Sequence, residues 1–503
     1  MAGSWVLPTM LALPLAASVL LLVAGRGADR WARGIGVAVT GVDLALGVRL
    51  ALGFDAGNAG ELHARFTAPW VPQLDITLSL GVDGLSLPLV VLTALLSFLC
   101  AIYTVNHLPD PGRPRAFVGL LLFLQVGMLG TFLAQNLLLF FVFFEFVLIP
   151  MWFLIAVWGS GDRRRPAANV FILYTLTGSV LMLIGFLVLW WQAGTSDFSA
   201  LAAGGGASMS SSTQLLVVLL VGGGLAVKVP MWPLHTWLPD AHTAAPTVAS
   251  VLLAGVLLKM GTYGLVRIML PSVPQGTHDV APYLAALAVV GVVYGALASF
   301  GQRDLKRLIA FSSVGHMGFV LLGIATLVPI GVNGAMFGNV AHGLITGLLF
   351  FVVGGLRLRF GTTSLTELPR ALYARTPRLA FLLAFAAMAS LGLPGLAGFW
   401  GEFLSLVGAY LPASSELTLF RILLVVAALG TVFAAAYFLR VLRRVGQGDR
   451  PAPRVADLAG YEAASWLPLA ALVLLFGLAP ALLLDLTAPV VNHLLAAAVG
   501  AGR

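Results

Sequence analysis

The chain has 503 residues, of which 59% are hydrophobic and only 10% are charged, and its formal net charge is +8. Soluble domains carry about 25% charged residues, and a soluble protein of this size could not keep so much apolar surface away from water. The composition therefore excludes a soluble globular protein and predicts an integral membrane protein. The basic residues form short clusters instead of one continuous patch, which argues against nucleic-acid binding.

Cys100 is the only cysteine and lies in an apolar segment. One cysteine cannot form an intrachain disulfide, a cysteine-based zinc site or an iron–sulfur cluster. The first charged residue is Arg26, after the apolar stretch 4–25. Because this stretch lacks the basic start of a signal peptide, it is predicted to be a first transmembrane helix.

Apolar segments long enough to span a bilayer recur along the whole chain. A helix needs about 20 apolar residues to cross the hydrocarbon core. We therefore predict an all-α integral membrane fold with about 14 transmembrane helices. They lie near 4–25, 34–53, 84–105, 116–134, 136–158, 168–192, 213–238, 245–270, 281–300, 306–328, 333–356, 378–411, 418–440 and 464–485. The polar segment 54–83 is predicted to be an extramembrane loop with a hairpin, and 488–503 a short surface helix.

The distribution of basic residues supports this helix count. Most of the 28 Lys and Arg residues fall in alternate loops, near 26–33, 113–115, 163–165, 303–307, 357–378 and 440–454. The opposite loops and helix ends carry Arg49, Arg65, Arg267, Arg421 and Arg503. Since cytoplasmic loops are enriched in Lys and Arg, the arginine-rich loops are predicted to be cytoplasmic. An even number of helices then leaves both termini on the external side.

Four charged residues lie inside predicted transmembrane helices: Glu145, Lys228, Lys259 and Glu402. A charge at the centre of a bilayer costs about 2.5 kcal/mol or more and usually marks an internal path. Desolvation disfavours the ammonium form of a buried lysine, so a Glu–Lys pair can take up and release a proton. We predict that these four residues transfer protons. The alternative is that they form structural ion pairs that only hold helices together.

Two histidines, His316 and His342, lie in predicted helices between Lys259 and Glu402. A single histidine on an apolar helix is more often a packing residue. The imidazole pKa of about 6.5 nevertheless suits proton shuttling, and both histidines lie in segments between the buried charges. They are predicted to connect Lys259 to Glu402.

Four other polar residues receive weaker or structural interpretations. His235 and His242, near the cytoplasmic end of the seventh helix, are weaker candidates for proton uptake. Lys306, which lies among arginines at the start of a helix, is predicted to be an ordinary cytoplasmic charge. Asp83 precedes the third helix and is predicted to cap it.

Two predicted helices contain residues that interrupt helices. The seventh includes Pro230 and Pro233, and the twelfth includes Gly392, Pro394 and Gly395. Proline removes a backbone donor, and unwound backbone at membrane depth is tolerated only where it is buried or lines a wet cavity. Helices 7 and 12 are therefore predicted to be broken, as in two inverted five-helix repeats. The predicted divisions are 1–110 (helices 1–3 and the external loop), 111–272 (first repeat), 273–445 (second repeat) and 446–503 (helix 14 and tail).

Five longer runs carry a family resemblance that covers nearly the whole chain. They are FEFVLIPMWFLI, KVPMWPLHTWLPDAHTAAPT, LLKMGTYG, QRDLKRLIAFSSVGHMGF and LPGLAGFWGEF. Together they resemble the M-type antiporter-like subunits of proton-pumping NADH–quinone oxidoreductase, respiratory complex I. The Mrp-type sodium/proton antiporter subunits share the same scaffold.

The resemblance implies a role for each candidate residue. Glu145 and Lys228 resemble a coupled pair in helices 5 and 7, and Lys259 resembles the central lysine of helix 8. His316 and His342 resemble the connecting relay, and Glu402 resembles the terminal residue of the broken helix 12. Because the related L and N subunits usually have lysine at that last position, Glu402 favours the M type.

The resemblance also implies a function, partners and a location. It implies a non-redox translocase subunit that moves protons when quinone is reduced in partner subunits, in a bacterial inner (plasma) membrane. This chain is expected to bind no cofactor or metal, whereas FMN, iron–sulfur clusters and quinone belong to partner subunits. The expected partners are L-, N- and K-like membrane subunits, the peripheral redox arm, lipid, protons and water. An Mrp-type sodium/proton antiporter subunit and a passive membrane scaffold are the alternatives.

Overall fold

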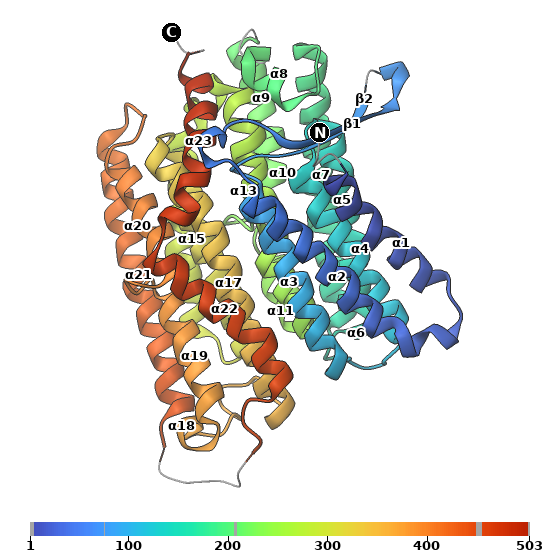
Figure 1. Ribbon diagram of the computed structural model, residues 1–503. Coiled ribbons are helices and arrows are strands. Elements are labelled where there is room, and N and C mark those ends of the chain that lie inside the picture. Colours follow the sequence, from blue (N-terminus) through green and yellow to red (C-terminus); the bar gives the residue numbers. More distant parts are fainter. Residues whose placement is uncertain (1–4, 75, 206–208, 449–454, 501–503) are drawn as a thin grey trace.

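The computed structural model describes residues 5–74, 76–205, 209–448 and 455–500 and is almost entirely helical (Figure 1). Within these residues, 13 helices are long and apolar enough to cross a membrane. They correspond to all of the predicted helices except the twelfth, which is divided into two shorter ones. Arg450, Arg454 and Arg503, which entered the predicted charge distribution, lie outside the described residues.

The N-terminal part consists of three long helices and a hairpin. Its elements are α1 (Val6–Val23), η1 (Arg26–Ala28), α2 (Asp29–Leu52), η2 (Ala56–Asn58), β1 (His63–Val71), η3 (Pro72–Leu74), β2 (Ile76–Val82) and α3 (Leu87–Asn106). β1 and β2 pair antiparallel, with Phe66 opposite Leu80. This confirms the hairpin predicted in the polar loop.

The next part contains the first broken helix. Its elements are α4 (Pro114–Leu133), α5 (Leu137–Phe146), α6 (Leu148–Trp158), α7 (Arg164–Ala193), α8 (Phe198–Ala200), η4 (Leu201–Gly205), α9 (Ser211–Val217), η5 (Val218–Gly222), α10 (Gly223–Lys228), α11 (Trp237–Ala244), α12 (Thr247–Leu252), η6 (Leu253–Leu257), α13 (Leu258–Gly264), η7 (Leu265–Met269) and α14 (Leu270–Ser272). The predicted seventh helix stops after Lys228, and α11 begins only at Trp237. The prolines between them account for this break, because they cannot continue the hydrogen-bond ladder.

The second broken helix lies in the following part. Its elements are α15 (Pro274–Gly301), α16 (Leu305–Ala325), α17 (Pro329–Phe360), α18 (Leu372–Arg375), α19 (Pro377–Ser390), α20 (Ala397–Tyr410) and α21 (Leu417–Gly446). Between α19 and α20, Gly392 has a φ of +73° and Gly395 a φ of +90°. Glycine adopts this region without a steric penalty. Both short helices pack against α17, so the predicted twelfth helix is two half-helices in series.

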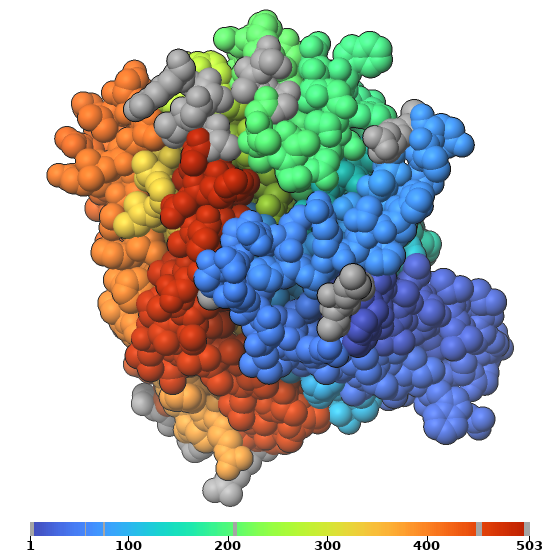
Figure 2. Space-filling view, turned by 45° about the horizontal axis from the view of Figure 1, so that its top comes forward, coloured from blue at the N-terminus to red at the C-terminus, as the bar shows by residue number. Residues whose placement is uncertain are grey.

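The C-terminal part consists of α22 (Gly460–Leu478) and α23 (Ala481–Gly500). The predicted fourteenth helix extended to 485, whereas α22 ends at Leu478 and α23 begins earlier than the predicted tail helix. Pro480 lies between them and interrupts the backbone ladder. α23 packs against α17 and α14 and runs beside the segment that carries the hairpin (Figure 2).

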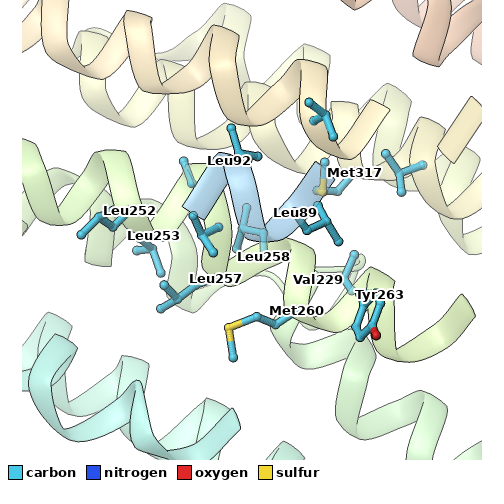
Figure 3. Packing of buried hydrophobic residues seen from close by; sticks show 14 of the residues in the cluster. Leu89, Leu92, Val229, Leu252, Leu253, Leu257, Leu258, Met260, Tyr263 and Met317 are labelled. Carbon is cyan, nitrogen blue, oxygen red and sulfur yellow. The ribbon is translucent and has the colours of Figure 1, made fainter. Parts of the chain in front are cut away.

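The core is centred on the eighth helix, α12 to α14, whose apolar window is wholly buried. Figure 3 shows Leu257 and Leu258 of this helix packed near Leu89 and Leu92 of α3 and Met317 of α16. α7 and α21, by contrast, expose leucines and valines on their outer faces, as helices that contact lipid or neighbouring subunits do. The central helix therefore carries its polar residues deep inside the molecule.

Helix neighbours follow the same order in the two halves. In the first half, the contacts α4–α5, α6–α7, α7–α10, α10–α13 and α13–α4 close a ring. In the second half, α15–α16, α16–α17, α17–α20, α20–α21 and α21–α15 close a corresponding ring. Each ring contains an odd number of predicted membrane crossings. The second ring therefore begins on the opposite side of the membrane from the first. This correspondence supports the predicted inverted repeats, which stay a prediction.

Candidate functional site

Lys259 lies at the centre of the buried helix, in α13 between the π-helical segments η6 and η7. Its side chain is 0% exposed. The Nζ atom lies 2.5 Å from His342 Nδ1 on α17 and also donates to the carbonyl oxygen of Ala254 in η6. π-helical turns are frequent at functional sites, and here they lie on both sides of the buried lysine.

A continuous set of titratable side chains extends from Lys259 to the second broken helix. The rings of His342 and His316 are 5.6 Å apart between centroids. His316 Nδ1 lies 2.9 Å from Glu402 Oε1 on α20, and its Nε2 lies 2.9 Å from Ser390 Oγ at the end of α19. We call Lys259, His342, His316 and Glu402 the central row. A cavity is lined by the last three of these residues.

Glycines bring α20 close enough to α17 to complete the central row. A Cβ added to Gly401 would lie 2.6 Å from the Cα of Gly338 on α17, and one added to Gly408 would lie 2.6 Å from the Cα of Gly331. Small residues at helix contacts let the backbones approach in this way. The next residue after Gly401 is Glu402, so this close contact fixes the depth of its carboxylate.

Glu145 and Lys228 form a second, looser arrangement, which we call the outer pair. Lys228 is the last residue of α10, where its positive charge faces the C-terminal end of the helix dipole. Its Nζ lies 4.7 Å from the centroid of the Phe144 ring. The Lys228 residue is 1% exposed. Glu145 follows Phe144 on α5 and lies near Ser179 of α7. Among the described residues, neither Glu145 Oε1 nor Lys228 Nζ has a hydrogen-bond partner.

The structure therefore brings together four of the six predicted proton-transfer residues and keeps the outer pair apart from them. Glu145 and Lys228 do not form an ion pair within 4.0 Å in the described chain. No hydrogen bond recorded for the described residues joins Lys228 to Lys259. Gly261, two residues after Lys259, faces Val229 across the contact between α13 and α10.

The interpretation of Lys306 as an ordinary cytoplasmic charge is wrong. Lys306 is 1% exposed, and its Nζ donates to the carbonyl oxygen of Ala245 at 2.6 Å. The long side chain points inward because α16 begins beside the turn between α11 and α12. The sequence offered one signal, since this is the third lysine of a chain whose other basic residues are arginines.

Asp43 is a buried acid that sequence reasoning missed. It lies within α2, is 0% exposed, and accepts a hydrogen bond of 2.6 Å from Gln125 Nε2 on α4. The criterion that found Glu145, a carboxylate within an apolar span, would have found it. Ser390 and Thr346, which contact the histidines of the central row, were also missed, because hydroxyls in helices give no sequence signal.

Asp83 and Arg267 form a buried structural pair. Asp83 Oδ1 accepts hydrogen bonds from the backbone N–H groups of Leu85 and Ser86, at 3.1 and 3.0 Å. These bonds close the turn before α3, whose N-cap residue is Ser86, so the prediction that Asp83 caps this helix is wrong. Asp83 Oδ2 forms an ion pair with Arg267 of η7. Its predicted position near a helix end suggested that Arg267 faces the external solution. The residue is only 8% exposed, so it faces the protein interior instead.

No group of three or more His, Cys, Asp and Glu side chains that could hold a metal ion occurs in the described part of the chain. The titratable groups are instead arranged in a line through separate helices. Such an arrangement suits the passage of protons between side chains and water.

Comparison with known proteins is consistent with this geometry. Residues 134–430 match the transmembrane family described as NADH:quinone oxidoreductase/Mrp antiporter. The chain belongs to this family. The matched residues include the central row and the outer pair.

Individual members of the family match over nearly the full length. The NADH-quinone oxidoreductase subunit M of Rhodobacter capsulatus is 39% identical over 499 residues, which cover 96% of this chain and 94% of that protein. A chain of respiratory complex I from Thermus thermophilus with bound NADH has a TM-score of 0.85 and 32% identity, covering 97% of this chain and 99% of that chain. A chain of the Mrp complex from Dietzia sp. DQ12-45-1b has a TM-score of 0.85 at 22% identity and covers 99% of this chain and 100% of its own. This last likeness concerns the fold alone.

Proposed function

We propose that this chain is the M-type, proton-translocating membrane subunit of an NADH–quinone oxidoreductase. The observation that carries the proposal is the central row, in which side chains from α13, α17, α16 and α20 approach one another inside an apolar bundle. Ionisable residues inside a membrane protein are costly and usually serve an ion path. The likeness to M subunits over nearly the whole chain supports the same function.

In the proposed mechanism, a proton moves along the central row by successive transfers. The Lys259 ammonium gives a proton to His342 Nδ1, and the imidazolium then releases its other proton from Nε2 toward His316. His316 passes a proton from Nδ1 to Glu402 Oε1, which lies 2.9 Å away. After these transfers Lys259 is a neutral amine, both imidazoles are neutral and Glu402 is protonated. Lys259 then takes up one proton from water and Glu402 releases one to water, so the central row can begin again.

The outer pair is proposed to drive these transfers electrostatically. When Glu145 and Lys228 are close, their charges compensate each other; when they separate, the lysine loses its proton readily. Quinone reduction in partner subunits would change this pairing. We propose that FMN, iron–sulfur clusters and quinone belong to those partners, together with L-, N- and K-like membrane neighbours in a bacterial inner membrane. The arginine-rich loops would face the cytoplasm and both termini the outside.

An Mrp-type sodium/proton antiporter subunit is the second candidate, and the shared fold favours it. Adding NADH to inverted membrane vesicles that contain the intact complex distinguishes the two. We expect the vesicle interior to acidify at the same rate with and without sodium, as measured by the quenching of a pH-sensitive dye. Acidification that requires sodium, or that NADH fails to start, would favour the antiporter.

A passive scaffold predicts a different response to loss of the outer pair. We expect complexes with Lys228→Ala or Glu145→Ala to assemble and to lose proton uptake by about a hundredfold, the lower end of the effect of losing a proton-transfer group. Assembly is measured by co-purification of the partner subunits in mild detergent. Failure to assemble would favour the scaffold, and wild-type pumping in both variants would remove the outer pair from the mechanism.

A further inference from the structure

A cavity lies between α2, α3 and α4, three helices that pack against one another (Figure 1). It encloses about 340 Å³, part of it open to solvent, and it is lined by no residue of the central row or the outer pair. We call it the side cavity. Its polar lining includes Arg33, Thr40, Ser97, Thr104 and Gln125. Because Arg33 is exposed near the start of α2, the side cavity leads inward from the predicted cytoplasmic side.

Asp43 lies at the inner end of the side cavity. Gln125 Nε2 donates to Asp43 Oδ2 at 2.6 Å, so the carboxyl group is bonded to a lining residue. Thr40 lies three residues before Asp43 on α2, and residues at this spacing share one face of a helix. Asp43 and Gln125 are both 0% exposed. The pair is therefore shielded from lipid and can meet water only through the side cavity.

Ser97 lies at the same depth as Asp43. A Cβ added to Gly41 on α2 would lie 3.2 Å from the ring of Phe98 on α3, and one added to Gly47 would lie 3.8 Å from the Cβ of the alanine three residues before Ser97. These two contacts bracket Asp43 on one helix and Ser97 on the other, since the two helices run in opposite directions. A carboxyl, an amide and a hydroxyl group thus meet at one level between three helices.

The carboxyl and the amide each leave one oxygen atom without a partner. Asp43 Oδ1 and Gln125 Oε1 are both buried, and neither forms a hydrogen bond in the part of the chain that the structure describes. Ser97 Oγ is also unpartnered there. Asp43 takes part in none of the ion pairs of the described residues. A buried carboxylate without a countercharge is costly, so the site requires a positively charged ligand.

Charged side chains of the surrounding helices lie nearer the helix ends than Asp43 does. α1 and α3 carry none, although α3 carries the titratable Cys100 and Tyr103. Arg49, the nearest basic residue along α2, lies over the Trp5 ring, 5.1 Å from its centroid. The charged residues of η1, α2 and α4 other than Asp43 are Arg26, Asp29, Arg30, Arg33, Arg49 and Arg115. Since none of them forms an ion pair with Asp43 in these described helices, the ligand must come from solution.

We propose that Asp43 and Gln125 form a proton-binding site, distinct from the central row and the outer pair, that takes its proton from water in the side cavity. The two unpartnered oxygen atoms are both acceptors, so a proton on Asp43 Oδ1 that is donated to Gln125 Oε1 satisfies both. The amide already donates to Oδ2, and the loaded pair is neutral. A hydronium ion in the side cavity gives the proton to the carboxylate and becomes water, which the Ser97 hydroxyl can bind. Release of the proton reverses this step.

Asp43→Asn replaces the proposed neutral acid with a neutral group of the same shape. The new amide can donate to Gln125 Oε1 and accept from Gln125 Nε2, so the intact complex should assemble with the wild-type yield. Asp43→Leu leaves the buried amide of Gln125 unpaired and should lower the yield. If Asp43→Asn assembles as poorly as Asp43→Leu, the site needs a negative charge and the proposal is overturned.

The pH dependence of stability tests whether the site holds a proton. In the proposed site the folded chain holds a proton that an unfolded chain releases above about pH 4. Relative to Asp43→Asn, the wild type should therefore lose stability as the pH rises, by up to about tenfold in the unfolding equilibrium for each pH unit. The measurement is the thermal unfolding midpoint of the purified complex from about pH 5 to about pH 8. A constant difference between the two midpoints over this range would overturn the proposal.

A metal cation is the competing ligand, and replacing sodium by choline distinguishes it from a proton. The wild-type midpoint should be the same in both salts. A midpoint that falls without sodium in the wild type but not in Asp43→Asn would mean that an ionised Asp43 holds a metal ion, which overturns the proton site. The matched control is Thr40→Val, which removes a lining hydroxyl that already donates to the Gly36 carbonyl of its own helix. Its midpoint should follow the wild type at every pH.

Infrared spectroscopy detects the bound proton itself. A protonated carboxyl group has a C=O stretching band that an ionised one lacks. At neutral pH the difference spectrum between the wild-type complex and Asp43→Asn should contain this band. The band should shift in deuterium oxide, because water in the side cavity exchanges the proton. Absence of the band would overturn the proton site, and a band that does not shift would overturn its loading through the side cavity.

Proton pumping separates this site from the proposed proton path. Within the described chain, the hydrogen bond of the Asp43 side chain is to Gln125 and leads to neither the central row nor the outer pair. Asp43→Asn should therefore keep the wild-type ratio of proton uptake to NADH oxidation in inverted vesicles. A ratio lowered by about a hundredfold would place Asp43 in the proton path and overturn its separation from the central row. A missing infrared band with normal pumping would overturn the proton site and leave the proposed function standing.

Discussion

Replacing Lys259 by arginine should lower NADH-driven proton uptake by about a hundredfold, because the side chain can no longer give up its proton. Arginine keeps the positive charge and can still donate to the Ala254 carbonyl, so assembly should be preserved. The measurement is the initial rate of proton uptake divided by the rate of NADH oxidation in inverted vesicles. A purely electrostatic role for Lys259 would leave this ratio unchanged in the arginine variant.

The matched control for Lys259→Arg is Thr262→Val. Thr262 lies on the same short helix, and its Oγ1 donates to Asn339 Oδ1 of α17 at 2.9 Å. The valine variant therefore removes a buried contact between the same two helices without changing a titratable group. We expect it to assemble and pump close to the wild-type rate. If both variants lose pumping equally, packing between α13 and α17 is responsible and the central row is not the proton path.

Much of the fold could be predicted because lipid restricts what a sequence can contain. Unbroken apolar segments had to be helices, since backbone groups in hydrocarbon must be satisfied internally. Charged loops marked the helix ends. Prolines and glycines located both breaks, after Lys228 and between Ser390 and Ala397. The end of α22 was misjudged because apolar composition continues past Pro480 into α23, so hydropathy gave no boundary there.

The candidate site was predictable in its residue types but not in its connections. Lys259 and Glu402 were conspicuous because charges are rare in apolar helices. Lys259 contacts His342, whereas Lys228 Nζ has no hydrogen-bond partner among the described residues. This difference depends on helix rotation and depth, which sequence spacing does not fix. Lys306 was misinterpreted for the same reason: a residue at a helix start can face solvent or the interior, and only the packing of α16 against the turn at Ala245 decides which.

Buried charges with a structural role should respond differently from those of the central row, and Arg267 provides the test. Replacing Arg267 by methionine should destabilise the folded chain by about 3–5 kcal/mol, because Asp83 would be left buried without its countercharge. Asp83 is 2% exposed, so water cannot compensate for the loss. The measurement is the yield and thermal unfolding midpoint of the purified complex.

A double variant separates the lost ion pair from lost packing. Asp83→Asn can still accept the backbone hydrogen bonds of Leu85 and Ser86 but carries no charge. Combined with Arg267→Met, it should recover most of the stability lost in the single variant, because no uncompensated charge remains. Complexes that assemble should retain the wild-type ratio of proton uptake to NADH oxidation, since both Asp83 carboxylate oxygens and the Nε and Nη2 atoms of Arg267 are bonded within the protein and neither residue lies in the central row. A lowered ratio in the stable double variant would mean that Asp83 and Arg267 belong to the proton path, and that a fully paired buried charge can be as functional as an unpaired one.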